Sequence, residues 1–284
     1  MYYTIKSLLD SHSKNLISLN KKDVEVCLCH IINKPRTFIH LNPEYEITKS
    51  QYKQFQGFIK LLKNGQPLAY VIGNEEFYGY EYFINNDVLI PRSETEIIIP
   101  EILKYGDKIF EENNKLTIID AGSGSGCIGL TIASERPNWN IILIEKSLKS
   151  IDLLKKNHDH YLHKNCTIIA TDWLKGINQN IADIIVSNPP YIDFGSKYVD
   201  KNVYKFEPHH ALFSDNKGLS DIKTLVSQAR FTLNENGLLF LENGFDQSDK
   251  IMDILKENYY EDIDIILDYN GIKRFTISRS SYYG

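Results

Sequence analysis

The sequence predicts an α/β protein in which a small helical bundle precedes a mostly parallel, doubly wound sheet. Three observations predict this fold. Helical periodicity dominates before residue 75, short β-branched runs alternate with helical segments from residue 115 onward, and a glycine-rich loop joins the first such run to a helix. The chain of 284 residues is long enough for one large or two smaller domains, each with its own core.

The first 75 residues carry apolar side chains three and four positions apart, which is the spacing of amphipathic helices. Helices are expected over residues 2–19, 22–33 and 48–62, and Thr48 is the expected N-cap of the third. The apolar stripe of that third helix is expected to lie in the core of the bundle rather than to form a docking surface; it consists of Tyr52, Phe55, Phe58, Ile59 and Leu62.

A β-hairpin is expected over residues 76–91, which are rich in aromatic and β-branched residues. Its two extended runs would be Phe77–Ile84 and Val88–Ile90, with the turn at Asn85–Asp87 and Pro91 ending the second run. This hairpin would link the bundle to the rest of the chain.

The remaining sequence alternates between strands and helices. Strands are expected at residues 116–120, 141–145, 167–170, 183–187, 238–242, 263–267 and 275–277. Helices are expected over residues 93–104, 127–135, 147–157, 219–235 and 247–257, the first with Ser93 as its N-cap. The last two strands are separated only by Asp268–Arg274, which is too short for a crossover helix, so this pair should be antiparallel.

The glycine-rich loop indicates a cofactor site. Asp120-Ala121-Gly122-Ser123-Gly124-Ser125-Gly126 follows the first strand of the sheet and precedes a helix. Glycines allow backbone amides to approach a ligand closely, and Glu145, at the end of the next strand, could accept hydrogen bonds from ribose hydroxyls. Residues 124–129 also match the dinucleotide pattern G-x-G-x-x-G, so the loop predicts a nucleotide-like cofactor without deciding which one.

The segment Ser187-Asn188-Pro189-Pro190-Tyr191, at the end of the fourth strand, suits a substrate with a planar amide-type NH2 group. Asn188 offers a side-chain carbonyl, and Pro189 has no N–H and presents only its backbone carbonyl. Pro190 holds Pro189 extended, and Tyr191 offers a flat face for stacking. Two acceptors would then hold the two N–H bonds, but a glutamine amide and adenine N6 fit this pattern equally well.

Charge and cysteine content narrow the function class. Lys and Arg number 32 and Asp and Glu 37, a net charge of -5, which disfavours a protein that wraps duplex DNA. The 4 cysteines form no C-x-x-C pair and are expected to be reduced, and the C-x-C spacing of Cys27 and Cys29 does not suit common zinc sites, so no metal is expected. With neither a signal peptide nor a run of about 18 apolar residues, the chain is expected to be cytoplasmic, without a membrane partner.

Taken together, these residues resemble the class I S-adenosylmethionine-dependent methyltransferases, and most closely the HemK/PrmC family of protein-(glutamine-N5) methyltransferases. The resemblance covers nearly the whole chain and rests on the order of several motifs. Besides the glycine loop and the Asn-Pro-Pro-Tyr segment, they are Pro67–Gly73, Glu76–Gly79, Leu89–Glu96, Phe206–Pro208 and Leu241–Gly244.

The resemblance implies a division of the chain and roles for its residues. Residues 1–75 would form a helical substrate-docking domain, 76–91 the hairpin linker and 92–284 a seven-stranded catalytic domain. S-adenosylmethionine, which leaves as S-adenosylhomocysteine, would be bound by Asp120, Gly122, Ser123, Gly124, Ser125, Gly126, Glu145, Asp172, Trp173 and Asn188. Substrate binding would fall to Asn188, Pro189, Pro190 and Tyr191, with Asn188, Pro189 and Tyr191 as the catalytic group.

The implied substrate is the glutamine of the Gly-Gly-Gln loop of class 1 peptide chain release factors, modified by a monomeric enzyme. Ser93 departs from the proline common in release-factor enzymes and resembles the enzymes that methylate a glutamine of a large-subunit ribosomal protein. Glu94-Thr95-Glu96 returns to the release-factor pattern, which favours that substrate. Competing hypotheses are a nucleic-acid amino methyltransferase, a nicotinamide-dependent oxidoreductase and a non-enzymatic adaptor.

Overall fold

A computed structural model describes residues 3–13 and 19–281 of the chain. By its internal contacts the chain divides into two compact units. Unit 1 holds the described residues up to Asn74 together with 200–206, and unit 2 holds 75–199 and the described residues from 207 onward. Part of the helix expected over 2–19 lies outside the described residues, because 14–18 are not among them.

Unit 1 is mainly helical. Its elements are β1 (Tyr3–Thr4), α1 (Ile5–Ser13), α2 (Lys21–Ile32), α3 (Arg36–Leu41), β2 (Glu46–Ile47), α4 (Lys49–Lys63), α5 (Leu68–Ile72) and α9 (Lys201–Phe206). The strands β1 and β2 pair antiparallel, with Tyr3 opposite Ile47. A buried apolar core joins the helices, and Phe55, Ile59 and Leu62 of α4 lie in it, with Tyr52 and Phe58 packed against it. The expected core role of the α4 stripe is therefore confirmed.

The N-terminus of α4 has the cap that the sequence predicts. The Thr48 hydroxyl accepts a hydrogen bond from the Gln51 N–H at 3.2 Å, and the Gln51 side chain accepts one from the Thr48 N–H at 3.0 Å. This reciprocal pair is a capping box, which satisfies two backbone N–H groups that the first helical turn leaves without a helical partner.

The hairpin lies earlier in the chain than expected. Its strands are β3 (Asn74–Phe77) and β4 (Tyr80–Phe83), joined by Tyr78 and Gly79. The expected turn at Asn85–Asp87 is therefore wrong. Tyr78 and Gly79 both have positive φ, 52° and 78°, which is the requirement of a two-residue hairpin turn whose twist matches that of the strands. The sequence does not indicate this turn, because its first position is Tyr78, which lies within a run of aromatic residues.

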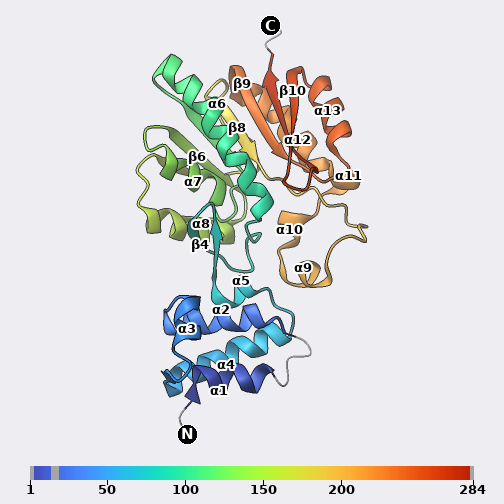
Figure 1. Cartoon of the computed structure of the whole chain (residues 1–284). Coiled ribbons are helices and arrows are strands. Elements are labelled where there is room, and N and C mark those ends of the chain that lie inside the picture. The colour runs from blue at the N-terminus through green and yellow to red at the C-terminus, as the bar shows by residue number, and fades with distance from the viewer. Residues whose placement is uncertain (1–2, 14–18, 282–284) are drawn as a thin grey trace. The chain divides into compact units, whose positions relative to one another are not determined.

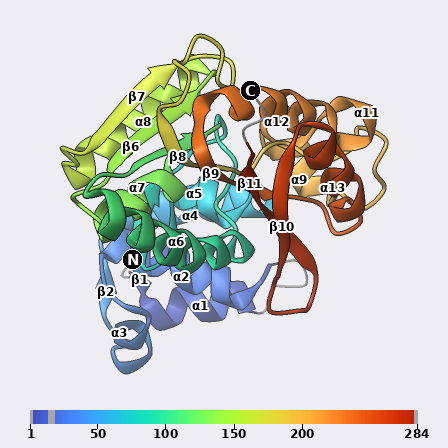
Figure 2. The same ribbon diagram turned by 90° about the horizontal axis from the view of Figure 1, so that it is seen from above.

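Unit 2 is built on a seven-stranded sheet with the order β10-β11-β9-β8-β5-β6-β7. Figure 2 shows this twisted row of strands running from β7 to β10. The strands are β5 (Thr117–Ala121), β6 (Asn140–Glu145), β7 (Cys166–Ala170), β8 (Ala182–Ser187), β9 (Leu233–Glu242), β10 (Tyr260–Leu267) and β11 (Lys273–Ser280). Pairs among β5 to β9 are parallel, whereas β11 pairs antiparallel with both β9 and β10. The seven expected strands and the antiparallel final pair are confirmed.

Helices cover both faces of this sheet, as Figure 1 shows for α6 and α7 on one side and α12 and α13 on the other. The helices of unit 2 are η1 (Ser93–Ile97), α6 (Ile98–Asn113), α7 (Cys127–Glu135), α8 (Leu148–Tyr161), α10 (His209–Leu212), α11 (Asp215–Gly218), α12 (Ser220–Thr232) and α13 (Ser248–Glu257). Unit 2 has one buried apolar core on each face of the sheet. Along β5, Ile118 lies in the core beneath α6 and α7, and Ile119 lies in the core beneath α12 and α13. This alternation explains why β5 is largely apolar on both faces.

The segment after the hairpin differs from the expected helix over 93–104. It begins as the single-turn η1 and becomes α-helical only from Ile98, and Ser93 is not its N-cap. The Ser93 hydroxyl instead donates to the Glu94 carboxylate at 3.2 Å. Among the described residues, no helix is both long and apolar enough to span a bilayer.

Candidate active site

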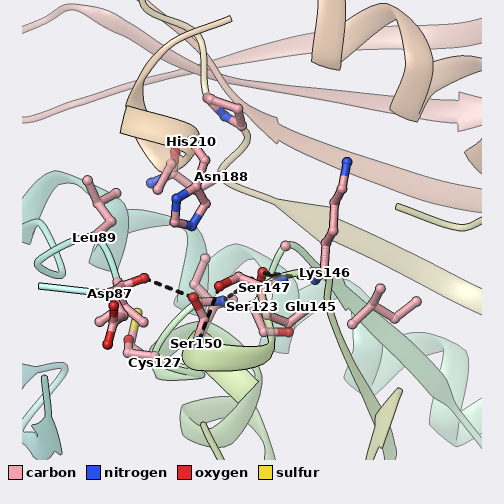
Figure 3. Close-up of a pocket in the computed structure, with 18 of the residues that line it drawn as sticks. Asp87, Leu89, Ser123, Cys127, Glu145, Lys146, Ser147, Ser150, Asn188 and His210 are labelled. Carbon is pink, nitrogen blue, oxygen red and sulfur yellow. Dashed lines mark hydrogen bonds between the residues drawn. The ribbon is translucent and has the colours of Figure 1, made fainter. Parts of the chain in front are cut away.

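A cavity of about 630 Å³ opens within unit 2 where the carboxyl ends of β5, β6 and β8 meet. That edge of an open α/β sheet is where cofactors bind, and the volume lies within the range of small-ligand sites. Figure 3 shows Asn188 and His210 on one side of the cavity, facing Ser123, Glu145 and Ser147 on the other. The sequence-predicted residues that line it are Gly122, Ser123, Gly124, Ser125, Glu145, Asp172, Trp173, Asn188 and Pro190.

The glycine loop wraps one wall of the cavity because its backbone adopts conformations that other residues avoid. Gly122, Gly124 and Gly126 have φ of 78°, 56° and 86°. A side chain at Gly122 would also place its Cβ 3.1 Å from the Trp173 ring, and one at Gly126 would collide with Leu154. Gly126 is not among the lining residues, so its role in this structure is to let α7 start against α8.

Glu145 anchors the loop to the end of β6. Its Oε2 accepts a hydrogen bond from the Gly124 N–H at 2.9 Å, and its Oε1 accepts from the N–H groups of Lys146 and Ser147, both at 2.8 Å. The side chain is buried apart from its cavity face. A carboxylate can accept about four hydrogen bonds, so three to backbone leave capacity for a ligand hydroxyl.

Asp120 lies beneath the loop and is not among the residues that line the cavity. Its Oδ2 accepts from the Gly129 N–H at 3.0 Å, in the first turn of α7. Burial raises the pKa of this carboxyl to about 7. Its contact with the helix N-terminus holds the loop in shape, and a direct role in cofactor binding stays a prediction.

Asp172 and Trp173 form the wall beyond β7. The Asp172 carboxylate pairs with the Lys146 ammonium at 3.0 Å, and both side chains line the cavity. Trp173 has a positive φ of 53°, unusual for a bulky residue, and its indole N–H donates to Asp221 at 3.2 Å. The indole is thereby fixed against Gly122, where it lines the cavity.

Asn188 faces the cavity at the end of β8 and is held by a buried chain of hydrogen bonds. Its Nδ2 donates to the Thr95 hydroxyl at 3.3 Å, and that hydroxyl donates to Glu242 Oε2 at 2.6 Å. The Tyr191 hydroxyl donates to the other oxygen of Glu242 at 3.1 Å. Glu242 is at the end of β9, next to β8, and is 1% exposed. Burial raises its pKa to about 7.

The remaining residues of the Asn-Pro-Pro-Tyr segment lie behind Asn188. Pro190 lines the cavity, whereas Pro189 and Tyr191 are not among the lining residues. The Tyr191 carbonyl accepts from the Gln247 side chain at 2.8 Å, and burial with the nearby Glu242 carboxylate raises the pKa of the phenol. The expected stacking of Tyr191 on the substrate stays a prediction.

Several residues of the site received no role from the sequence. Asp87, Arg92, Thr95 and His210 also line the cavity. The Arg92 guanidinium contacts the buried Glu207 carboxylate at 2.6 Å and thus joins the segment before η1 to the segment before α10. Arg92, Thr95, Glu207 and Glu242 stand within motifs that carried the resemblance, but neither periodicity nor composition distinguishes them. His210, in α10, lines the cavity.

The cavity offers contacts that suit a nucleoside, and its lining holds carboxylates together with the cations Arg92 and Lys146. The Trp173 ring, the exposed backbone of Gly122 and the Glu145 carboxylate all line the cavity. Asp87 and Asp221 line it as well. Within 3–13 and 19–281, no cluster of three His, Cys, Asp or Glu has metal-site geometry. Cys27 and Cys29 are free thiols in unit 1, and Cys27 is part of its buried core, where burial raises its pKa to about 12.

Sequence comparison shows what this chain is similar to. Residues 6–73 match the family model of the PrmC N-terminal domain, and residues 107–205 match the methyltransferase small domain. A release factor glutamine methyltransferase of Mycoplasma mycoides is 38% identical over 91% of this chain and 92% of its own length. Proteins of the same name from Coxiella burnetii and Escherichia coli are 33% and 32% identical, over 97% and 93% of this chain and 99% and 92% of their own lengths.

Solved structures share the fold at low sequence identity. A methyltransferase from Pyrococcus furiosus superposes with a TM-score of 0.52 at 16% identity, covering 80% of this chain and 98% of its own. A 16S rRNA methyltransferase of T. thermophilus, solved with AdoMet and guanosine, gives a TM-score of 0.50 at 16% identity over 74% and 50% of the two chains. The fold of unit 2 is that of the class I methyltransferases.

The strand order also separates this fold from a dinucleotide-binding one. A dinucleotide-binding sheet continues in parallel past its fifth strand, whereas here the final strand β11 inserts antiparallel between β9 and β10. The nicotinamide hypothesis rested on the glycine loop and Glu145 alone, and this topology removes its support.

Proposed function

Since this chain belongs to the release factor glutamine methyltransferase family, we propose that it transfers a methyl group from S-adenosylmethionine to the side-chain amide nitrogen of the glutamine in the Gly-Gly-Gln loop of class 1 release factors. The observation that carries the proposal is the orientation of Asn188, whose Nδ2 donates to Thr95 and whose Oδ1 is left to accept a hydrogen bond. An acceptor at the cavity wall is what a substrate NH2 group needs.

The site would act by binding and orienting the reactants. When bound, S-adenosylmethionine supplies an electrophilic methyl group on a positively charged sulfur. Glu145 and Trp173 would hold its ribose and adenine, and the loop from Gly122 to Gly126 would hold the remainder. Asn188 Oδ1 would accept one N–H bond of the substrate amide. The family resemblance assigns the other to the carbonyl of Pro189, which is next to Asn188 but is not among the lining residues. Together they would aim the nitrogen lone pair.

The same two acceptors would stabilise the positive charge that develops on the amide nitrogen during transfer. Orientation of this kind lowers a barrier by up to about 7–11 kcal/mol in ideal cases. No base is required before transfer, because the nitrogen attacks through its own lone pair as the bond from the methyl group to sulfur breaks. S-adenosylhomocysteine would leave as a neutral thioether, and the methylated nitrogen would then release one proton to water.

Unit 1 is proposed to bind the protein substrate, as the position of the PrmC N-terminal match suggests. Deleting residues 1–73 should raise the KM for a release factor while the Kd for S-adenosylmethionine stays unchanged. The enzyme is proposed to act as a monomer. A substrate in the translation machinery places the proposed activity in the cytoplasm.

Methyl transfer from labelled S-adenosylmethionine tests the proposal directly. The acceptors are a class 1 release factor, its Gly-Gly-Gln→Gly-Gly-Ala variant and a glutamine-bearing large-subunit ribosomal protein. Label on the wild-type release factor alone is the expected result. Label on the ribosomal protein alone would reassign the substrate, and label on neither would overturn the proposal.

Asn188→Ala tests the site that carries the proposal. It should lower kcat by at least about a hundredfold with little change in the Kd for S-adenosylmethionine, because it removes an interaction made to the reacting group. Asn234→Ala is the matched control, since Asn234 donates to Asp183 at 2.6 Å on the same sheet and does not line the cavity. An Asn188→Ala enzyme with full turnover would refute the assignment.

A further inference from the structure

The buried carboxylate of Glu242 has no part in the transfer described above, yet it contacts two elements of the site. Its two oxygens accept from the hydroxyl groups of Thr95 and Tyr191, at 2.6 and 3.1 Å. The Thr95–Glu242 distance of 2.6 Å is at the short end for a hydrogen bond between two oxygen atoms. Thr95 is 2% exposed and Glu242 is 1% exposed, so water does not compete for these bonds.

The number of hydrogen atoms on the Thr95 hydroxyl fixes the direction of the hydrogen bonds that join Asn188, Thr95 and Glu242. A threonine hydroxyl has one hydrogen and two lone pairs, and the hydrogen of Thr95 is committed to Glu242. Thr95 can therefore only accept from its second neighbour, Asn188. The end of the Asn188 amide that faces Thr95 must then be Nδ2, as the structure has it. Its Oδ1 is thereby directed away from Thr95.

The alternative orientation would harm the reaction. If Asn188 turned its amide over, Nδ2 would meet the substrate NH2 group, so that two donors faced each other. A free Thr95 hydroxyl could donate to Oδ1 and stabilise that turned-over state. While Glu242 holds the hydrogen of Thr95, the turned-over state leaves Oδ1 against an oxygen lone pair, which is unfavourable.

We infer that Thr95 and Glu242 are positioning residues: they fix which end of the Asn188 amide faces the methyl acceptor. The inference rests on the proposed function, since it concerns how Asn188 presents its oxygen to the substrate. It extends the site from the Asn-Pro-Pro-Tyr segment to two side chains on η1 and β9.

The variants Thr95→Val and Thr95→Ser test the inference. Valine keeps the shape and removes the hydroxyl, so kcat for the release factor should fall on the order of tenfold to a hundredfold. The Kd for S-adenosylmethionine should stay within about threefold, because Thr95 makes its hydrogen bonds to Asn188 and Glu242. Serine keeps the hydroxyl and should restore most of the lost activity.

Thr131→Val is the matched control for loss of a buried threonine hydroxyl. Thr131 is fully buried in unit 2 and bonds to the Tyr82 hydroxyl at 2.8 Å, and neither residue lines the cavity. It should lose stability as Thr95→Val does but keep its kcat. Equal losses of kcat in both variants, or none in Thr95→Val, would overturn the inference.

A double variant tests the part played by Glu242. Glu242→Gln can accept from only one of its two donors, so it should lower kcat in the wild-type background. In the Thr95→Val background it should lower kcat no further, because the connection to Asn188 is already lost. Additive losses would remove Glu242 from the proposal. A wild-type enzyme that methylates no glutamine would instead refute the proposed function itself, which these variants cannot do.

Discussion

Glu145 Oε2 lies 2.9 Å from the backbone nitrogen of Gly124 and accepts its hydrogen bond. The end of β6 is thus joined to the middle of the glycine loop by one side chain. Because the same carboxylate caps the N–H groups of Lys146 and Ser147, the loop and the start of α8 share an anchor. The cofactor's ribose would meet a carboxylate that is already fixed in place, which reduces the entropy lost on binding.

Replacing Glu145 by alanine should weaken S-adenosylmethionine binding by about tenfold or more. A hydrogen bond to a charged group contributes about 1.5–3 kcal/mol, and about 1.4 kcal/mol corresponds to a tenfold change in Kd. Isothermal titration of Glu145→Ala measures this. Glu135→Ala is the control, since Glu135 accepts from Tyr80 outside the cavity. A Kd within twofold of wild type would contradict a role for Glu145 in binding.

Gly122→Ala should reduce both stability and cofactor affinity. Its φ of 78° is costly for alanine, by about 1–2 kcal/mol, and the new Cβ would press on the Trp173 ring. Gly271→Ala separates the two effects, because Gly271 has a similar φ of 75° with no atom within 4 Å of the added Cβ. Both variants should lower Tm, but only Gly122→Ala should raise the Kd for S-adenosylmethionine. Equal affinities would show that the Trp173 ring does not contribute.

The parts of the fold that follow from periodicity could be predicted from the sequence, and those that depend on single backbone conformations could not. The central strands β5, β6 and β8 were predictable because helices cover both faces of the sheet and these strands are mostly apolar. The helices α2, α8 and α13 were predictable because each has a stripe of buried apolar residues at helical spacing. The hairpin turn was missed because Tyr78 adopts a positive φ of 52°, which a tyrosine does not signal. The short helices α3, α5 and α10 carry too few turns for a pattern.

The candidate site likewise contains residues that the sequence indicates and residues that only the structure reveals. Glycines and a carboxylate at strand ends are visible in sequence, and the structure places Gly122, Gly124 and Glu145 around one cavity. Thr95 and Glu242 are 147 residues apart. The pairing of β8 with β9 places Glu242 beside Asn188, and Thr95 contacts both from η1. Glu242 could have been recognised as a site residue because it is an acidic residue at the carboxyl end of a strand. Asp120 and Glu145 occupy the same position near the ends of β5 and β6.

Arg92→Met should destabilise unit 2 more than Glu207→Gln, although both break one ion pair. The Glu207 side chain is 1% exposed, whereas that of Arg92 is 33% exposed. Removing Arg92 therefore leaves a buried charge without its partner, at a cost of about 3–5 kcal/mol in comparable pairs. Removing the Glu207 charge leaves an arginine that water can reach. Urea unfolding of both variants and of the double variant, which should recover most of the Arg92→Met loss, tests this order; the reverse order would contradict it.

Asp120→Asn should change how stability depends on pH. The pKa of Asp120 is about 7 in the folded chain against an ordinary value of 3.8, chiefly because the carboxyl is buried, and Glu145 raises it further. The Gly129 N–H and Ser123 oppose this rise, and the nearby Cys127 and Cys166 thiols have pKa values raised to about 12 and are neutral. The folded state thus holds the Asp120 proton more tightly than the unfolded state.

As pH rises from 3.8 to about 7, the unfolded chain releases this proton before the folded one does, so this contribution to stability is lost. The loss is at most about 1.4 kcal/mol per pH unit for one proton. Asparagine is neutral throughout and still accepts from Gly129, so Asp120→Asn should become more stable relative to wild type between pH 5 and pH 8. Asp107→Asn should show no such change, because Arg136 lowers the pKa of Asp107 and keeps it ionised across that range. Urea unfolding at both pH values decides it, since a constant difference for Asp120→Asn would mean that the carboxyl is already ionised at pH 5.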